Sequence, residues 1–170
     1  MKTAFRALLI ASLLGFSALA GVSQTFPVPD GVFTDGEYAM VREASGMRMG
    51  FRLSVDGSTV LASITMRTDG WVALGFGSPK MDGSRMILAY VKDGEAEFTE
   101  DLGKGWSHAP IAPFALARAA TEKDGWTTLE VALPAEGFLK GRTLDVIAAW
   151  GRNDNFRSKH SGRASLPVSF

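Results

Sequence analysis

The chain has 170 residues, of which 46% are hydrophobic and 21% are charged, and its formal net charge is zero. This length accommodates one domain with a core of ordinary size, and the sequence shows no basic patch of the kind that binds nucleic acid. The absence of cysteine excludes a disulfide framework, a thiolate metal site, covalent C-x-x-C-H haem attachment and a catalytic thiol.

The first twenty residues have the pattern of a secretory signal peptide. Lys2 and Arg6 form a cationic head, an apolar run extends from Ala7 to Ala20, and small residues occupy positions 18 and 20. The run is shorter than the ~20 residues needed to span a bilayer, so we expect cleavage after Ala20 and a periplasmic or secreted protein. Cleavage removes two cations and no anions, which changes the formal net charge from zero to −2.

Residues 21–36 contain two prolines and three glycines without periodicity, and they are predicted to form an irregular leader. From residue 37 to residue 170 the sequence consists mainly of short runs rich in β-branched and aromatic residues, which are predicted to be strands. The runs cover residues 37–44, 47–57, 59–70, 71–77, 85–94, 95–103, 114–125, 126–134, 143–151 and 163–170.

Four of these runs end in Asp-Gly, at Asp56, Asp69, Asp93 and Asp124. This residue pair readily adopts the positive φ angles of tight hairpin turns, so it predicts antiparallel neighbours. The one helical candidate, residues 134–141, is too short for more than a turn or two. The sequence therefore predicts a single all-β domain, an antiparallel sandwich or barrel.

Residues with catalytic potential are few. The chain has two histidines, His108 and His160, and it lacks both G-x-S-x-G and H-E-x-x-H. The glycines of the segment GFGSPKMDG lie between two predicted strands and do not precede a helix, which excludes a dinucleotide-binding loop. No nucleophile can be paired with a base, so we do not expect an independent enzyme.

Two residues stand out by their places in the chain. Met81 lies in a polar turn between two predicted strands, although methionine usually packs in a core, and His160 lies in a long polar loop before the final strand. Methionine sulfur and imidazole nitrogen are a pair of axial ligands in electron-transfer cytochromes, and neither requires a cysteine. Met81 and His160 therefore suggest a non-covalently bound b-type haem.

Two segments carry a resemblance to a known family. GWVALGFGSPKMDGSRMILAYVKDG, followed by an acidic strand that ends at Asp101, and LDVIAAWGRNDNFRSKHSGRASLPV resemble the haem-binding branch of the DOMON superfamily, which includes the cytochrome domain of cellobiose dehydrogenase. The resemblance implies an Ig-like antiparallel β-sandwich over residues 37–170. It also implies haem b between a methionine in the turn after the GW-x-ALG strand and a histidine in the loop before the last strand. Met81 and His160 match these two positions.

Each proposed ligand has a neighbouring alternative. Met86 follows Met81 closely, but it begins an apolar run and is interpreted as a core residue. Lys159 precedes His160, and a relative within the same superfamily pairs methionine with lysine. Adjacent residues of an extended segment point to opposite faces, so we expect only one of the two to face the site, and we favour His160.

Charged and aromatic residues near the two ligands receive weaker assignments. Haem carries two propionates, for which arginine is a favoured partner. The candidate propionate partners are Arg157, Arg163, Lys159 and Lys80. The candidate aromatic walls of the pocket are Trp71, Trp150, Phe76 and Phe156.

The residues are compatible with three functions. The favoured one is a b-type electron carrier or redox-enzyme subunit that docks transiently with a redox partner protein or membrane complex. The second is a carbohydrate- or other ligand-binding module without haem, in which an exposed aromatic such as Trp106 stacks on a sugar ring. The third is a soft copper site built from Met47, Met49, Met66, Met81, Met86 and His160.

Overall fold

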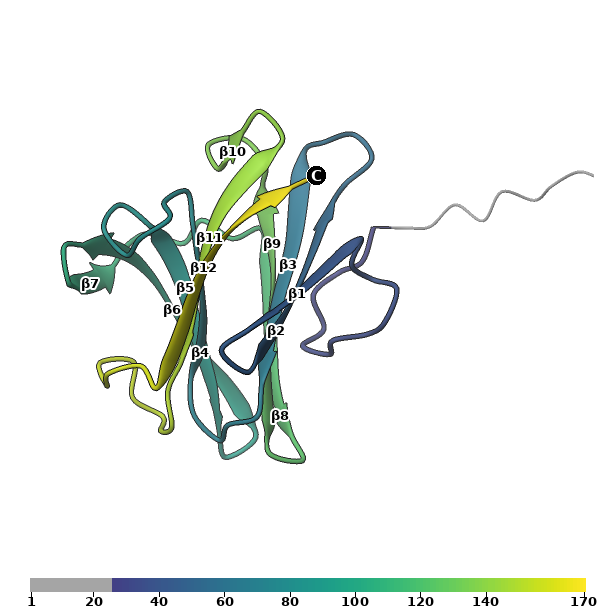
Figure 1. Ribbon diagram of the computed structural model, residues 1–170. Coiled ribbons are helices and arrows are strands. Elements are labelled where there is room, and N and C mark those ends of the chain that lie inside the picture. Colours follow the sequence, from purple (N-terminus) through teal and green to yellow (C-terminus); the bar gives the residue numbers. More distant parts are fainter. Residues whose placement is uncertain (1–25) are drawn as a thin grey trace, which may run out of the picture.

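The computed structural model describes residues 26–170, which form twelve strands (Figure 1). The strands are β1 (Met40–Ala44), β2 (Met47–Leu53), β3 (Thr59–Met66), β4 (Val72–Phe76), β5 (Arg85–Lys92), β6 (Glu95–Lys104), β7 (Ser107–Pro110), β8 (Ala117–Lys123), β9 (Trp126–Pro134), β10 (Leu139–Lys140), β11 (Thr143–Trp150) and β12 (Gly162–Ser169). No helix occurs within residues 26–170. The predicted helical candidate at residues 134–141 forms a turn and the two-residue strand β10.

The strands form two sheets that pack face to face (Figure 1). Sheet A has the order β1-β2-β3-β9-β8, and sheet B has the order β10-β11-β4-β5-β6-β7. The strand β12 pairs with β11 on the side away from β4. The β11–β12 pair and the β11–β4 pair are both antiparallel. The predicted all-β antiparallel sandwich is confirmed.

Three hairpins have tight two-residue turns in which both residues have positive φ. These turns are residues 45–46, 93–94 and 124–125, and each links two paired strands. Two of the four predicted Asp-Gly pairs therefore form tight turns. Residues 56–57 lie in the longer loop of the antiparallel β2–β3 hairpin, and residues 69–70 lie where the chain crosses from sheet A to sheet B.

The main core lies between the two sheets. Side chains alternate along a strand, so every second residue of β2 and β4 points into this core. Those residues are at most 1% exposed, and they are Met47, Met49, Phe51, Val72, Leu74 and Phe76. The intervening residues of β4 consequently point to the opposite face of sheet B.

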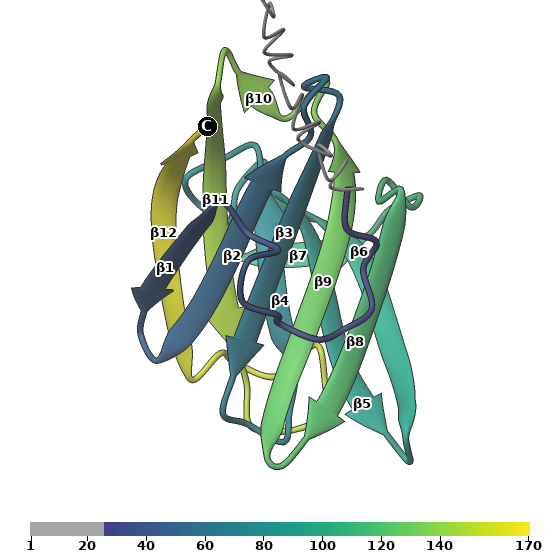
Figure 2. The same cartoon turned by 90° about the vertical axis from the view of Figure 1, so that its right-hand side faces the viewer.

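A strap without strands, residues 26–39, crosses the outer face of sheet A, where Figure 2 shows it passing in front of β3 and β9. The buried Glu130 of β9 holds it. Glu130 Oε2 accepts hydrogen bonds from the backbone N–H groups of Asp30 (2.8 Å) and Gly31 (2.9 Å), and Oε1 accepts one from the Tyr38 hydroxyl. Burial and the adjacent carboxylate raise the pKa of Tyr38, so its hydroxyl stays protonated and remains a donor.

A second buried glutamate holds the connection from β7 to β8, which crosses between the sheets. Glu100 Oε2 accepts hydrogen bonds from the backbone N–H groups of Phe114 (2.6 Å) and Ala115 (3.1 Å), and Oε1 forms an ion pair with Arg118 of β8. Three donors thus satisfy a carboxylate that would otherwise be buried at a large free-energy penalty. The crossing segment is fixed without a helix or a disulfide.

The predicted signal peptide, residues 1–20, and the first part of the predicted leader lie outside the described residues. Between residues 26 and 170, no helix has the length and hydropathy required to cross a membrane.

Replacing Glu130 with glutamine should lower the free energy of unfolding by about 1–3 kcal/mol, because the amide NH₂ would face a backbone N–H or the Tyr38 hydroxyl. Urea unfolding followed by tryptophan fluorescence measures this change. Glu136→Gln, on an exposed turn, is the matched control and should stay within about 0.5 kcal/mol of the wild type. Equal stability of the two variants would contradict the anchoring role of Glu130.

Candidate functional site

The outer face of sheet B, which points away from sheet A, is apolar at its centre. An antiparallel sheet commonly covers a core with one face and presents polar side chains on the other. Here Trp71, Ala73, Met86 and Leu88 form a second buried cluster on the outer face. The partly buried residues packed against it are Met81, Tyr90, Ile147, Ala149 and Phe156. Sheet B therefore has apolar side chains on both faces in this region.

Small residues form a hollow in this outer face. Ala73 of β4 lies opposite Ala149 of β11, and the next outward-facing position on β4 is Gly75. A Cβ atom at Gly75 would lie 2.6 Å from the Ile147 side chain, closer than packed carbon atoms can approach. Glycine is thus the residue that fits at position 75 of the floor.

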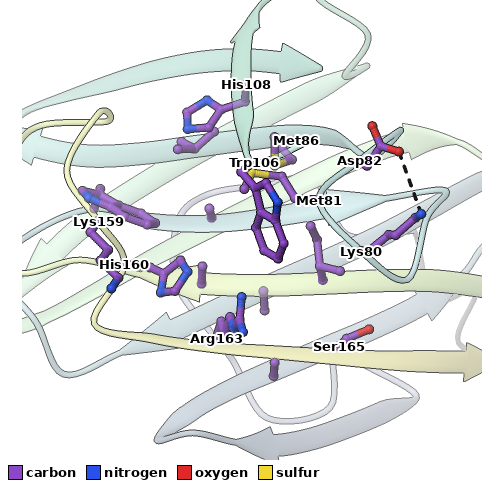
Figure 3. A pocket seen from close by; sticks show the side chains of 18 of the residues that line it. Lys80, Met81, Asp82, Met86, Trp106, His108, Lys159, His160, Arg163 and Ser165 are labelled. Atoms are coloured by element: carbon purple, nitrogen blue, oxygen red, sulfur yellow. Dashed lines mark ion pairs between the residues drawn. The ribbon is translucent and has the colours of Figure 1, made fainter. Parts of the chain in front are cut away.

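A cavity of about 1240 Å³ lies over the hollow (Figure 3). Small-molecule pockets commonly measure about 300–1,000 Å³, so this one can accept a bulky ligand. Sheet B forms its floor. The walls come from the turn 77–84, the β6–β7 hairpin, the loop 151–161 and strand β12.

The turn 77–84 carries Met81 to one wall of the cavity. The Ser84 N–H donates to the Met81 carbonyl (3.0 Å), which closes the turn. Two further backbone hydrogen bonds attach it to β6: Gly83 N–H to the Gly103 carbonyl (3.0 Å) and Gly103 N–H to the Ser84 carbonyl (2.9 Å). A Cβ at Gly103 would lie 1.8 Å from the Met81 carbonyl oxygen, so the turn can rest on β6 only because residue 103 is glycine.

The loop 151–161 carries His160 to another wall of the cavity. Trp71 anchors this loop, because its indole N–H donates to the Ser158 hydroxyl (2.8 Å) and its carbonyl accepts the Gly151 N–H (2.8 Å). Beside this anchor, the ring of Phe156 packs on Tyr90 with a centroid distance of 4.6 Å. The loop is therefore fixed to sheet B on both sides of its polar tip.

Met81 and His160 line the same cavity although 78 intervening residues separate them in the chain. Figure 3 shows them on two different segments, with the imidazole directed into the space between the walls. Both residues are half-buried. Within residues 26–170, neither side chain forms a hydrogen bond or an ion pair, so the thioether sulfur and the ring nitrogens remain available to a ligand.

All four predicted cations line this cavity, and all four are exposed at its rim: Lys80, Arg157, Lys159 and Arg163. Asp82 is the only carboxylate among the described residues that line it, and it lies 3.8 Å from Lys80. The rim thus has a net positive formal charge above an apolar floor. This charge distribution suits a ligand that is apolar over most of its surface and anionic at one edge.

The alternative ligands are also close by. Met86 is 6% exposed in the outer-face cluster, as expected for a packed residue, but it also lines the cavity. Lys159 and His160 both line the cavity. The expected alternation does not separate these two residues, because the loop is irregular and not pleated at this point.

The aromatic candidates divide into two pairs. Trp71 lines the cavity, and Phe156 packs against the same outer-face cluster. Phe76 is fully buried in the main core, and Trp150 packs against that core. For Phe76 and Trp150 the predicted wall position is wrong, because strand alternation turns them toward sheet A.

The structure separates the methionines of the copper hypothesis. Met47, Met49 and Met66 belong to the main core between the sheets, whereas Met81 and Met86 belong to the outer face of sheet B. Sheet B therefore stands between the two groups. In addition, no cluster of three or more His, Cys, Asp or Glu residues within residues 26–170 is arranged to hold a metal ion.

His108, to which the sequence pattern assigns no role, also lines the cavity. Its Nδ1 lies 2.5 Å from Oδ2 of the buried Asp101, whose Oδ1 accepts a hydrogen bond from the Thr99 hydroxyl (2.5 Å). The strand that carries His108, β7, has four residues and no apolar alternation, so no strand was predicted there. The signal that could have located the cavity is the lack of alternation in residues 71–76 and 86–90, because strands buried on both faces read as continuous apolar runs.

Comparisons with known proteins found similarity in structure only. The sequence matches no protein-family model, and no curated protein has a matching sequence. The cytochrome domain of Myriococcum thermophilum cellobiose dehydrogenase aligns with a TM-score of 0.61 and 12% identity, over 76% of this chain and 80% of that domain. The cytochrome b domain of pyranose dehydrogenase from Coprinopsis cinerea aligns with a TM-score of 0.56 and 9% identity, over 72% of this chain and 76% of that domain.

The chain has the cytochrome b domain fold. The cytochrome domain of cellobiose dehydrogenase, which the segments 70–94 and 144–168 resemble, is thus also a protein whose fold this chain shares. At 9–12% identity the likeness concerns the arrangement of the strands. The roles of single residues in this chain must therefore be argued from its own cavity.

Gly103→Ala should displace the Met81 turn and lower the free energy of unfolding by about 1–3 kcal/mol, because the added methyl group overlaps the Met81 carbonyl. Methyl NMR of the methionines measures the displacement: the Met81 methyl resonance should shift, and those of Met47 and Met49 in the main core should not. Gly94→Ala is the control for destabilisation elsewhere: the added Cβ meets no atom, but the φ of +83° is strained for alanine, so stability should fall while the Met81 resonance stays unchanged. An unchanged Met81 resonance in Gly103→Ala would show that β6 does not hold this turn.

Proposed function

We propose that this protein is an exported b-type cytochrome that carries single electrons, with haem b held non-covalently between Met81 and His160. One observation carries the proposal: the two residues line one large cavity on the apolar outer face of sheet B. Methionine and histidine together are an axial ligand pair of electron-transfer haem proteins. The fold shared with two cytochrome domains supports the same conclusion.

The cavity has the chemistry that a haem requires. Porphyrin is a broad apolar ring, and the floor of the cavity includes the small residues Ala73, Gly75 and Ala149. Its two propionates are anionic, and we assign Arg157 and Arg163 to them because an arginine can bind a carboxylate through two parallel hydrogen bonds. The size of the cavity, its apolar floor and its cationic rim therefore fit the group together.

The ligand pair determines what the chain can do. When bound, haem supplies a one-electron iron couple. A protein ligand on each side leaves no position open for oxygen or substrate, so the protein acts as an electron carrier or a redox-enzyme subunit and not as an independent catalyst. The neutral thioether of Met81 is a weak donor that favours the ferrous state and raises the reduction potential.

The partner is a redox protein or a membrane electron-transfer complex. Such encounters are transient and use small interfaces, and the exposed rim of the cavity would leave the edge of a bound haem accessible to a partner. The predicted signal peptide directs the chain to the periplasm or outside the cell. Both similar structures are cytochrome domains of dehydrogenases, which supports an electron-transfer role beside a separate catalytic unit.

Met81→Ala and His160→Ala should each abolish the six-coordinate low-spin spectrum of the haem-loaded protein, because each removes one axial ligand. Visible absorption of the oxidised and the dithionite-reduced protein measures the change. The wild type should show sharp reduced bands, and each variant should show broad high-spin bands or lose the haem.

Matched variants address the neighbouring alternatives. Met86→Leu, His108→Gln and Lys159→Ala change residues that line the same cavity, and all three should keep the low-spin spectrum. His108 is the most stringent of these controls, because a carboxylate partner such as Asp101 is the usual support of a metal-binding histidine. Loss of the low-spin spectrum in His108→Gln and its retention in His160→Ala would show that His108, and not His160, is the haem ligand.

A ligand-binding module without haem is the second candidate, favoured by the 90% exposed Trp106 at the cavity. A protein that takes up no stoichiometric haem, and whose tryptophan emission instead responds to sugars, would replace the cytochrome with this module.

Arg163→Gln should lower the reduction potential, because removal of a cation from the rim weakens the stabilisation of the reduced, less positive haem. An effect of about 1 kcal/mol corresponds to about 40 mV for a one-electron couple. Spectroelectrochemical titration at low ionic strength measures it, and Arg42→Gln on the exposed edge strand β1 is the control. A potential that rises, or falls equally in both variants, contradicts the placement of Arg163 beside the haem.

A further inference from the structure

The tip of the β6–β7 hairpin carries a tryptophan at the cavity. Gly105 and Trp106 form the two-residue turn between Lys104 and Ser107, and Gly105 has a φ of +60°. Trp106 is 90% exposed, yet it lines the cavity, and Figure 3 shows its indole lying across the space between Met81 and His160. A large aromatic ring in this position marks a contact with a ligand.

A hydrogen bond attaches this tip to the turn that carries Met81. The Gly105 backbone N–H donates to Asp82 Oδ1 at 2.9 Å, and Asp82 directly follows Met81. The base of the same hairpin is held by the two backbone bonds between Gly103 and the 77–84 turn. The hairpin is therefore bonded to the turn both at its tip and at its base, and the two segments form one wall of the cavity.

The two parts of this wall present complementary groups. Met81 offers a sulfur ligand, and Trp106 offers a flat apolar face that reaches toward the His160 side of the cavity. Porphyrin and indole are both flat aromatic systems, and offset stacking of such rings is favourable. The opposite wall, the loop 151–161, supplies mainly polar and cationic groups to the cavity.

We propose that Trp106 is a haem-binding residue that packs its indole against the porphyrin and slows its release, and that Asp82 holds the hairpin tip in this position. This inference rests on the proposed function, since it concerns the same cavity and the same ligand. The hairpin thereby serves as a fixed cover of the cavity on the Met81 side.

The test is the rate of haem transfer from the loaded protein to an excess of apomyoglobin, followed by absorbance. Trp106→Ala should release haem about tenfold faster than the wild type, and Trp106→Phe, which keeps a smaller aromatic ring, about two- to threefold faster. Trp126→Ala is the matched control, because Trp126 also follows a hairpin glycine and is 43% exposed, but lies on sheet A away from the cavity. It should release haem at the wild-type rate.

Two variants test the tether. Asp82→Asn retains an oxygen that can accept the Gly105 N–H and should release haem at a rate close to that of the wild type. Asp82→Ala removes the acceptor and should speed release by a factor between those of the two Trp106 variants. Thermal unfolding of the haem-free proteins serves as the folding control: Trp106→Ala should match the wild type, because the side chain is 90% exposed.

The outcomes separate this inference from the proposed function. If the wild type shows the low-spin spectrum that depends on Met81 and His160, and Trp106→Ala releases haem at the wild-type rate, the role of Trp106 is wrong and the cytochrome stands. If the wild type takes up no haem, both are wrong. Faster release in Trp126→Ala than in Trp106→Ala would also overturn the assignment.

Discussion

The architecture depends on one sheet whose two faces are both apolar. The inner face of sheet B packs against sheet A, but no further sheet within residues 26–170 covers the outer face, which has Trp71 and Leu88 at its centre. Exposed apolar area of this kind is unfavourable in water, so the chain covers its edges with the turn 77–84, the β6–β7 hairpin and the loop 151–161. What remains between them is the cavity. The candidate site is therefore the uncovered part of a second, smaller core.

Two buried glutamates attach segments without strands to the sandwich. Segments without strands cannot satisfy their backbone N–H groups through a sheet, so those groups need other acceptors. Glu130 supplies them to the strap over sheet A, and Glu100 supplies them to the connection between β7 and β8. In both cases one carboxylate oxygen accepts two consecutive backbone donors, and the other oxygen binds a side chain from a different element. This arrangement attaches both segments to the sandwich without a disulfide.

The sequence predicted the sandwich well because strand periodicity and turn chemistry are local properties. For residues 69–70 the sequence predicted a hairpin, but the chain crosses there from sheet A to sheet B. The sequence pattern could not distinguish the two, because the difference depends on which sheet the next strand joins. Met81 and His160 could be singled out because each stands in an unusual local setting, but their shared cavity depends on the pairing of β4 with both β5 and β11. Gly103 and His108 were missed for a related reason. The need for a glycine at 103 arises from a carbonyl in another segment, and β7 is an edge strand without a pattern of its own.

The order of strands along the chain has a consequence for assembly. The loop that carries His160 and the strand β12 with Arg163 follow eleven other strands, and they supply an entire wall of the cavity. Ser165 of β12 also donates a hydrogen bond to the Pro79 carbonyl (2.7 Å), which joins this late segment to the turn that carries Met81. A chain without β12 lacks this wall of the cavity and also lacks Val168 of the main core, so the site cannot close before the last strand has joined β11. A ligand of this cavity can therefore be enclosed on all sides only after the C-terminal strand has folded against the rest of sheet B.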